Sequence, residues 1–175
     1  MTSGNQNIAI GKDSLTNITS GDSNIGIGSD ALGTATTAED VVAIGRNAGY
    51  AINNDAADAS IAIGRNALTA LTSGAGNTAI GYQALQGHTT GARNTVLGYQ
   101  AMDGTGGATV LDSNDNTFMG YHSGGGTWTT AVCQYNVGIG NYSLDGAMNG
   151  AEYNVGVGYD ALTALTSGRS NIAVG

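Results

Sequence analysis

The chain has 175 residues, among them 30 glycines, one cysteine and no proline, and its 13 acidic and five basic side chains give a net charge of −8. Five scattered cations in so acidic a chain exclude a phosphate-binding surface, so nucleic acid is a poor partner, and a lone cysteine excludes an intrachain disulfide. Leu, Ile, Val and Phe number only 32, a composition typical of disordered chains unless something other than a bulky core supplies the order.

A five-residue motif, first seen as Asn-Ile-Ala-Ile-Gly at 7–11, recurs along the whole chain, for example at 24–28 and 171–175. Its base period is 17 residues, which predicts a single repeat domain over residues 1–175 with ten copies of a short strand. The predicted strands end at Gly11, Gly28, Gly45, Gly64, Gly81, Gly98, Gly120, Gly140, Gly158 and Gly175.

Within each motif, apolar residues stand two apart, as Ile25 and Ile27 do before Gly28. Residues two apart share one face of a strand, and β-branched side chains favour strands. The residue between them is small in most copies, so we expect that opposite face to lie close against a neighbouring chain. The residues predicted to face that neighbouring chain are Ala9, Gly26, Ala43, Ala62, Ala79, Gly138, Gly156 and Ala173.

The rest of each repeat begins with a small residue followed by an apolar one, as in Ala31 and Leu32, which we expect to form a second, shorter strand. A Thr-Ser-Gly turn, as at 72–74, then leads into the next motif. So small a unit cannot bury its own face, so copies should stack with equivalent positions aligned in ladders. The predicted fold class is therefore all-β, a parallel β-solenoid or β-roll of about nine turns.

Ordering the backbone costs about 1–2 kcal/mol of conformational entropy per residue, and one turn offers too few large apolar side chains to offset that cost. Self-association is the economical explanation, and replacement of Ala79 by Glu is expected to abolish it.

The repeated pattern Asn-x-Ala-Ile-Gly-x-x-Ala/Ser covers essentially the whole chain and resembles the repeat of trimeric autotransporter adhesin heads, which is also found in bacteriophage tail fibres. The resemblance implies a left-handed parallel β-roll in each chain and a homotrimer of three chains side by side. It also implies an extracellular location, on a cell surface or a virion, and a role as a surface-exposed binding or stalk module.

Insertions at about 50–59, 103–115 and 121–135 interrupt the regular repeat, and loops on a rigid scaffold commonly carry recognition. The third insertion holds Trp128, the only tryptophan. The predicted receptor contact, for a cell-surface glycan or protein, consists of Trp128, Tyr121, Tyr135 and His122. The alternative is that Trp128 packs back on the shaft and covers the gap at Gly124.

Tyr82, Tyr99, Tyr121 and Tyr159 each follow a motif glycine, so neighbouring turns should stack their rings into a ladder. Such a ladder either covers the coil or presents a stripe for sugar stacking.

No enzyme chemistry is indicated. The glycine pattern at 26–31 has the spacing of a loosened dinucleotide fingerprint but lacks a strand-helix-strand context. His88 and His122 occupy different positions of the repeat, with no carboxylate cluster beside them in the sequence. We therefore expect no cofactor and no resident metal, although the Asp-Ser-Asn-Asp-Asn loop at 112–116 could hold a surface cation.

The function predicted from the sequence is that of an extracellular trimeric fibre segment, a phage tail fibre or a bacterial adhesin head, that serves adhesion or host-receptor recognition. No apolar stretch is long enough to span a bilayer, so membrane insertion of this segment is not expected. Two alternatives stay open: a self-assembling filament subunit that stacks head to tail, and a monomeric solenoid binding module.

Overall fold

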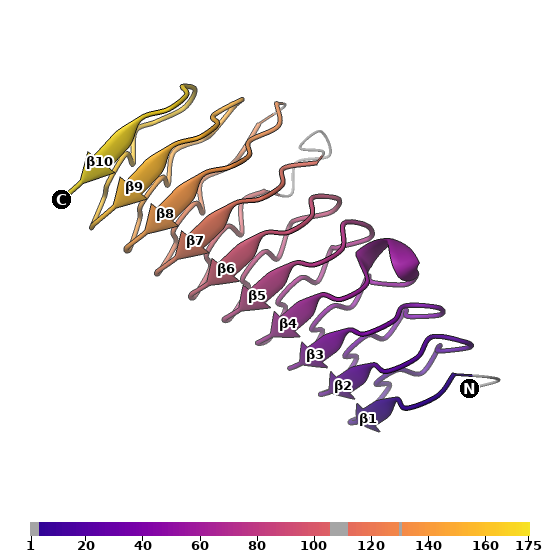
Figure 1. The fold of residues 1–175 in the computed structure, drawn as a ribbon. Helices are drawn as coiled ribbons and strands as arrows, with labels where there is room; N and C mark the ends of the chain where they lie inside the picture. The colour runs from indigo at the N-terminus through magenta and orange to yellow at the C-terminus, as the bar shows by residue number, and fades with distance from the viewer. Residues whose placement is uncertain (1–3, 106–111, 130) are drawn as a thin grey trace.

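Ten short parallel strands stack one after another along the length of the molecule. The computed structural model describes residues 4–105, 112–129 and 131–175, and its strands stack in chain order into one sheet (Figure 1). The strands are β1 (Ile8–Ile10), β2 (Ile25–Ile27), β3 (Val42–Ile44), β4 (Ile61–Ile63), β5 (Thr78–Ile80), β6 (Thr95–Leu97), β7 (Thr117–Met119), β8 (Val137–Ile139), β9 (Val155–Val157) and β10 (Ile172–Val174). The predicted all-β solenoid of about nine turns is confirmed.

Equivalent positions of the repeat lie beside one another along the rod. Gly26 at the centre of β2 pairs with Ala43 at the centre of β3, and the same register holds between all neighbouring strands. Outside the strands the hydrogen bonds also run from one turn to the next, because the backbone N–H of Asp30 donates to the carbonyl oxygen of Lys12 at 2.9 Å. The first strand β1 and the last strand β10 consequently lie at opposite ends of the rod (Figure 1).

The motif glycines make this close stacking possible. Gly28 has a φ of 130°, and a Cβ on it would lie 2.7 Å from the carbonyl oxygen of Gly45 in the next turn. Any side chain here would be strained by its backbone conformation and would also collide with the neighbouring backbone.

The segment after each glycine is a turn, so the prediction of a second, shorter strand was wrong. Leu32 has a φ of 51°, in the left-handed region, and its backbone N–H donates to the carbonyl oxygen of Ala48 in the next turn at 3.1 Å. Burial of the side chain and this hydrogen bond hold a conformation that leucine otherwise avoids. The same conformation recurs at Leu15, Leu68, Leu85, Met102, Leu144 and Leu162.

The small residue at the centre of each strand points into the coil of its own chain, so its assignment to a trimer interface was wrong. The coil is thin: a Cβ on Gly156 would lie 2.9 Å from Oγ of Ser143 on the facing turn. Opposite a serine even the Cβ of alanine would force a rearrangement, so the central position holds glycine there, and in most other strands it holds alanine. Gly26, Ala43, Ala62, Ala79, Gly138 and Gly156 are buried, while Ala9 and Ala173 in the two end strands are exposed and half-buried.

Phe118 is the one aromatic residue at the centre of a strand, and two glycines make room for its ring. A Cβ on Gly124 would lie 2.8 Å from Cδ1 of Phe118, and one on Gly138 would lie 2.6 Å from it. Trp128 packs edge-on against the Phe118 ring, with 5.9 Å between the centroids. The third insertion therefore widens the core at this turn.

The asparagine that opens most motifs is buried, and its side chain forms a ladder along the rod. Nδ2 of Asn94 donates to Oδ1 of Asn77 at 3.0 Å, while Oδ1 of Asn94 accepts the backbone N–H and the Nδ2 of Asn116, both at 3.1 Å. The fully buried members are Asn24, Asn77, Asn94, Asn116, Asn136 and Asn154. Each amide pairs with backbone groups that would otherwise be buried without partners. Val41 and Ser60 interrupt the ladder.

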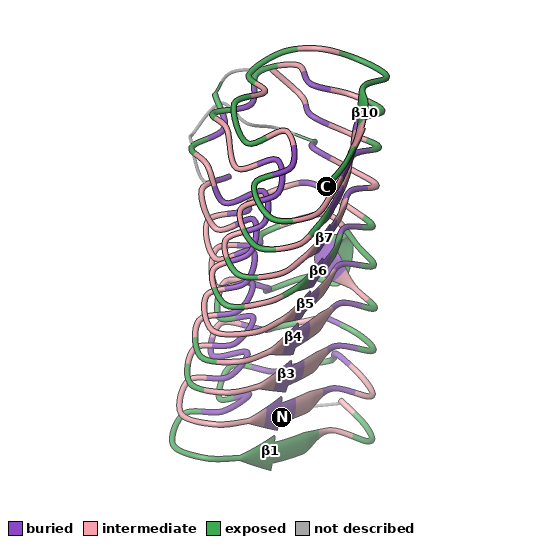
Figure 2. Ribbon diagram, turned by 90° about the vertical axis from the view of Figure 1, so that its left-hand side faces the viewer, coloured by how far each residue is buried: buried purple, intermediate pink, exposed green. Residues whose placement is uncertain are grey.

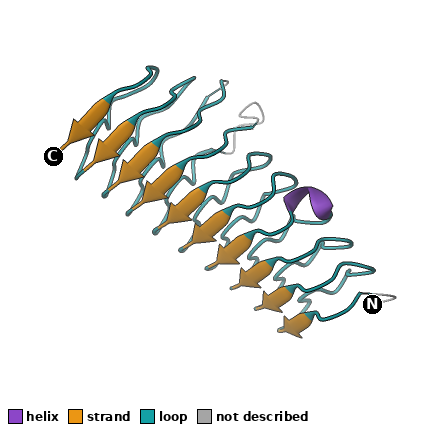
Figure 3. Ribbon diagram, viewed as in Figure 1, coloured by secondary structure: helices purple, strands orange, loops and turns teal. Residues whose placement is uncertain are grey.

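The first insertion carries the 3₁₀ helix η1 (Asp55–Ala57), drawn in purple in Figure 3. Ile52 enters the core beside Gly49, on which a Cβ would lie 3.2 Å from Cδ1 of Ile52, whereas Tyr50 stays outside and is 41% exposed. The insertion predicted at 103–115 falls partly on residues 106–111, which lie outside the described residues. Within the described part of the chain, no helix has the length and apolarity needed to cross a bilayer.

Candidate functional site

The outward face of the sheet carries two columns of mostly branched apolar side chains. The first and third residues of each strand point away from the coil, whereas the central residue is buried in eight of the ten strands (Figure 2). Even away from the rod ends, Leu97 is 45% exposed and Ile139 is 39% exposed. Partly exposed apolar columns of this kind make the face a candidate for binding.

The tyrosines that follow the motif glycines stack as the sequence predicted. The Tyr82 and Tyr99 rings lie 4.8 Å apart at 20°, and those of Tyr99 and Tyr121 lie 5.6 Å apart at 28°. In the preceding turn, the guanidinium group of Arg65 lies 5.9 Å from the Tyr82 centroid. Because these contacts cover the ring faces, the ladder presents ring edges to solvent, which favours the covering role over a sugar-stacking stripe.

Trp128 is not available as a receptor contact, so this part of the predicted site was wrong. Its side chain is 1% exposed, it packs on Phe118, and its Nε1 donates to the carbonyl oxygen of Gly124 at 3.0 Å. The alternative reading, in which Trp128 packs back on the shaft at Gly124, is the one the structure supports. An indole in water would leave Phe118 uncovered, so burial of both rings is favoured.

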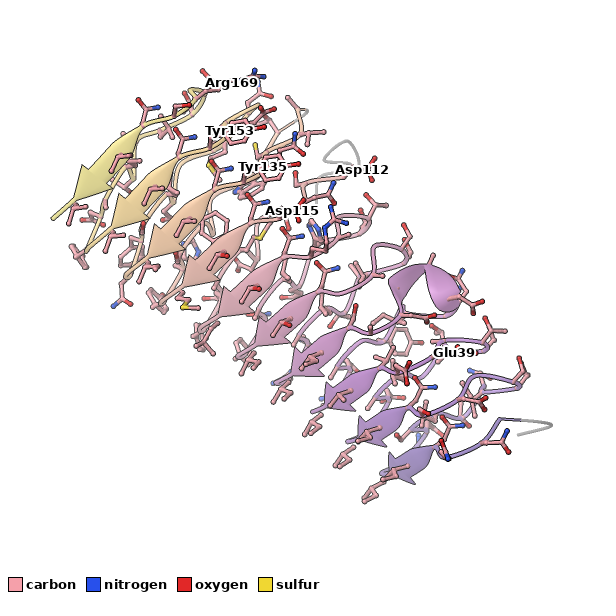
Figure 4. All side chains as sticks on the ribbon, in the orientation of Figure 1. Glu39, Asp112, Asp115, Tyr135, Tyr153 and Arg169 are labelled. Atoms are coloured by element: carbon pink, nitrogen blue, oxygen red, sulfur yellow. The ribbon has the colours of Figure 1, made fainter. Side chains whose placement is uncertain are left out.

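The three other predicted contact residues do not converge on one surface. Tyr121 follows the C-terminal end of β7 and lies 5.9 Å from the His122 ring. Tyr135 precedes the N-terminal end of β8 and stacks on Tyr153 with centroids 4.9 Å apart. Figure 4 places Tyr135 and Tyr153 along the same edge of the rod as Asp115. The predicted cluster therefore divides between the two ends of the strands.

His122 lies between two carboxylates that are far from it in the sequence, a cluster the sequence analysis missed. Its Nδ1 is 2.8 Å from Oδ1 of Asp145, and its Nε2 is 3.8 Å from Oδ1 of Asp103. Burial raises the pKa of both carboxyl groups, against the opposite effect of the nearby imidazole. Asp103 and Asp145 each lie three residues beyond the positions equivalent to His122 in the neighbouring turns, so the ladder of equivalent positions does not reveal them. The trio links three neighbouring turns.

The loop at 112–116, which the sequence left open as a surface cation site, has most of its polar side chains paired within the protein. The carboxylate of Asp115 pairs with the guanidinium of Arg93 at 2.7 and 2.8 Å, which lowers the pKa of the acid. Oδ1 of Asn114 accepts a backbone N–H of the previous turn at 2.6 Å, and Asn116 belongs to the buried ladder. Among the described residues, no group of three or more His, Cys, Asp or Glu side chains is placed to hold a metal.

The thiol of Cys133 and the imidazole of His88 are both buried inside the coil. Burial raises the pKa of the Cys133 thiol, which therefore stays protonated near neutral pH. Burial lowers the pKa of His88 to about 4, so its ring is neutral under the same conditions. The glycine pattern at 26–31 also lies on the interior column, where no phosphate could reach its centre.

Comparison with known proteins finds no matching family model, curated protein or solved structure.

Proposed function

We propose that this chain is a segment of an extracellular homotrimeric fibre, a phage tail fibre or a bacterial surface adhesin head, and that it serves adhesion or host-receptor recognition. The observation that carries the proposal is the outward strand face, on which apolar side chains remain partly or largely exposed from one end of the sheet to the other. The left-handed sense of the coil and the threefold arrangement are parts of the same proposal.

The distribution of side-chain size supports an interface on this face. In an ordinary half-buried strand the larger apolar residues face the core, but here the core side is nearly all Ala and Gly. The large branched side chains thus lie outside a coil that is already closed. Their burial requires a second surface, and a side-by-side copy offers an identical one.

The charge pattern also favours self-association through this face. None of the thirty strand residues is charged, although the chain carries a net charge of −8. The outward columns consist of Ile, Val, Leu, Met and Thr. Three copies around one axis would bury the three faces equivalently and close the assembly, leaving the charged edges to solvent.

Oligomeric state at micromolar concentration tests the proposal, measured by sedimentation equilibrium. The wild-type chain should sediment as a trimer, and the double variant Ile63→Lys with Ile80→Lys should be monomeric with an unchanged circular dichroism spectrum. Both residues are only partly buried within one chain, so their replacement spares the core. Gln83→Lys adds a charge beyond the strand end and should leave the trimer intact.

Replacement of Ala79 by Glu, expected from the sequence to break the trimer, should instead unfold the chain because Ala79 is in the core. A folded wild-type monomer would overturn the fibre proposal in favour of a solenoid binding module. An open-ended polymer would favour the head-to-tail filament.

A further inference from the structure

A hollow opens just beyond the C-terminal ends of β2 and β3. Its volume is about 450 Å³, and it is lined by Asp30, Asn47, Tyr50 and Thr69. These four side chains come from three successive turns, following β2, β3 and β4. The hollow therefore lies on the rim of the rod, away from the columns of the outward strand face.

Tyr50 differs from the seven other tyrosines of this chain. Each of the others makes a ring–ring contact with a neighbouring aromatic side chain, namely Tyr82, Tyr99, Tyr121, Tyr135, Tyr142, Tyr153 and Tyr159. The Tyr50 ring has no aromatic neighbour among the described residues and is 41% exposed. It lies instead against Gly33, where a Cβ would be 3.0 Å from Cε2 of the ring.

The start of the first insertion is what places Tyr50 there. Gly49 replaces the leucine found at this position in most turns, and Ile52 fills the core in its place. The carbonyl oxygen of Tyr50 accepts the hydroxyl of Thr34 at 2.6 Å, which anchors its backbone to the preceding turn. The backbone at Tyr50 is thereby fixed, and the ring lies against Gly33 and lines the hollow.

The polar groups around the hollow are oriented by contacts with the protein. Nδ2 of Asn47 donates to Oδ1 of Asn66 at 3.1 Å, and the Thr69 hydroxyl donates to the carbonyl oxygen of Asn47 at 3.1 Å. The Asp30 carboxylate accepts the hydroxyl of Ser29 at 2.7 Å. Each of these side chains keeps further acceptor capacity for a bound hydroxyl.

We propose that this hollow binds one neutral hexose unit of a surface glycan, a proposal that rests on the adhesive role proposed above. An aromatic ring beside a carboxylate, an amide and a hydroxyl suits a sugar, whose C–H face packs on the ring while its hydroxyls hydrogen-bond to the polar groups. Asp30 is the only charged lining residue, and its negative charge disfavours sialic acid and sugar phosphates. Single sites of this kind bind weakly, and several copies in one fibre gain avidity.

The test uses saturation-transfer NMR and chemical-shift titration with methyl glycosides of glucose, galactose and mannose at millimolar concentration. The wild-type protein should bind at least one of them and should not bind the methyl glycoside of sialic acid. Tyr50→Thr and Asp30→Asn should each weaken binding by about tenfold or more. Both substitutions insert residues that equivalent positions of neighbouring turns already carry, so the fold should be preserved.

Tyr153→Ser is the matched control, because it removes an exposed tyrosine at a position where the next turn has Ser170. This variant should bind like the wild type. Absence of binding to every neutral glycoside would overturn the proposed site, as would unchanged binding by Tyr50→Thr. A trimer that binds no sugar would leave the fibre proposal standing, whereas a monomer that binds sugar would overturn only the fibre proposal.

Discussion

Replacing His88 by Leu should remove much of the acid sensitivity of this fold. His88 is fully buried, and burial lowers its pKa from 6.5 to about 4. The equivalent position of the preceding turn holds Leu71, which is also fully buried. His88→Leu therefore introduces a side chain that this interior already accommodates one turn away.

The direction and size of the effect follow from proton binding. Between pH 6.5 and about 4 the unfolded chain binds a proton at His88 and the folded chain does not, so stability is lost as pH falls through this window. Each pKa unit corresponds to about 1.4 kcal/mol, so the whole window lowers the free energy of unfolding by about 3 kcal/mol. The raised pKa values of Asp103 and Asp145 increase stability as pH falls, which opposes the effect of His88. The wild type and His88→Leu both retain these two carboxyl groups, so their contribution cancels in the comparison.

Urea unfolding at a fixed protein concentration and at several pH values from about 4 to 7 measures this difference. Trp128 is the only tryptophan and is buried, so its fluorescence reports unfolding. The wild-type chain should lose about 3 kcal/mol more than His88→Leu between these limits. Leu71→Met keeps His88 and should behave like the wild type. If the free energy of unfolding falls by the same amount with pH in the wild type and in His88→Leu, the assignment of a neutral, buried imidazole is refuted.

Asn94→Ala should lower the free energy of unfolding by about 2–5 kcal/mol, since it leaves the backbone N–H of Asn116 and the carbonyl oxygen of Ser113 without these buried partners. Urea unfolding measures this loss, and a change below about 1 kcal/mol would contradict it. Gly156→Ala should cost about 1–3 kcal/mol because its Cβ displaces the Ser143 hydroxyl from its hydrogen bond, and adding Ser143→Ala should recover most of that loss. A double-mutant cycle that shows additive effects would argue against this coupling.

The position of every strand could be predicted from the sequence, but the direction in which its faces point could not. Alternation in a strand shows that Ile25 and Ile27 lie opposite Gly26, without telling which side is the interior. The usual rule places the larger apolar residues inside, and it fails here because the coil is too thin to hold them. Burial of Gly26 against Ser14 and Leu15 is a property of the facing turn.

Some packing details could nevertheless have been predicted by comparing positions between turns. A serine follows the motif wherever the next strand has glycine at its centre, in the pairs Ser14 with Gly26, Ser123 with Gly138 and Ser143 with Gly156. Each hydroxyl donates to the carbonyl oxygen of its glycine, at 2.8, 3.1 and 2.8 Å. The burial of Trp128 had a similar signal, since glycines border Phe118 on two sides.

The thinness of the coil also connects the stability of one chain to its assembly. An interior of Ala, Gly and one or two larger apolar side chains per turn buries limited apolar area, so the asparagine ladder and the hydrogen bonds between turns must supply much of the order. The larger apolar side chains have been placed on the outside, where they stabilise the fold only if another surface covers them. A chain built in this way gains stability from association, so its unfolding midpoint should rise with protein concentration. The outward columns thus contribute to folding through the interface, and the two processes share the same residues.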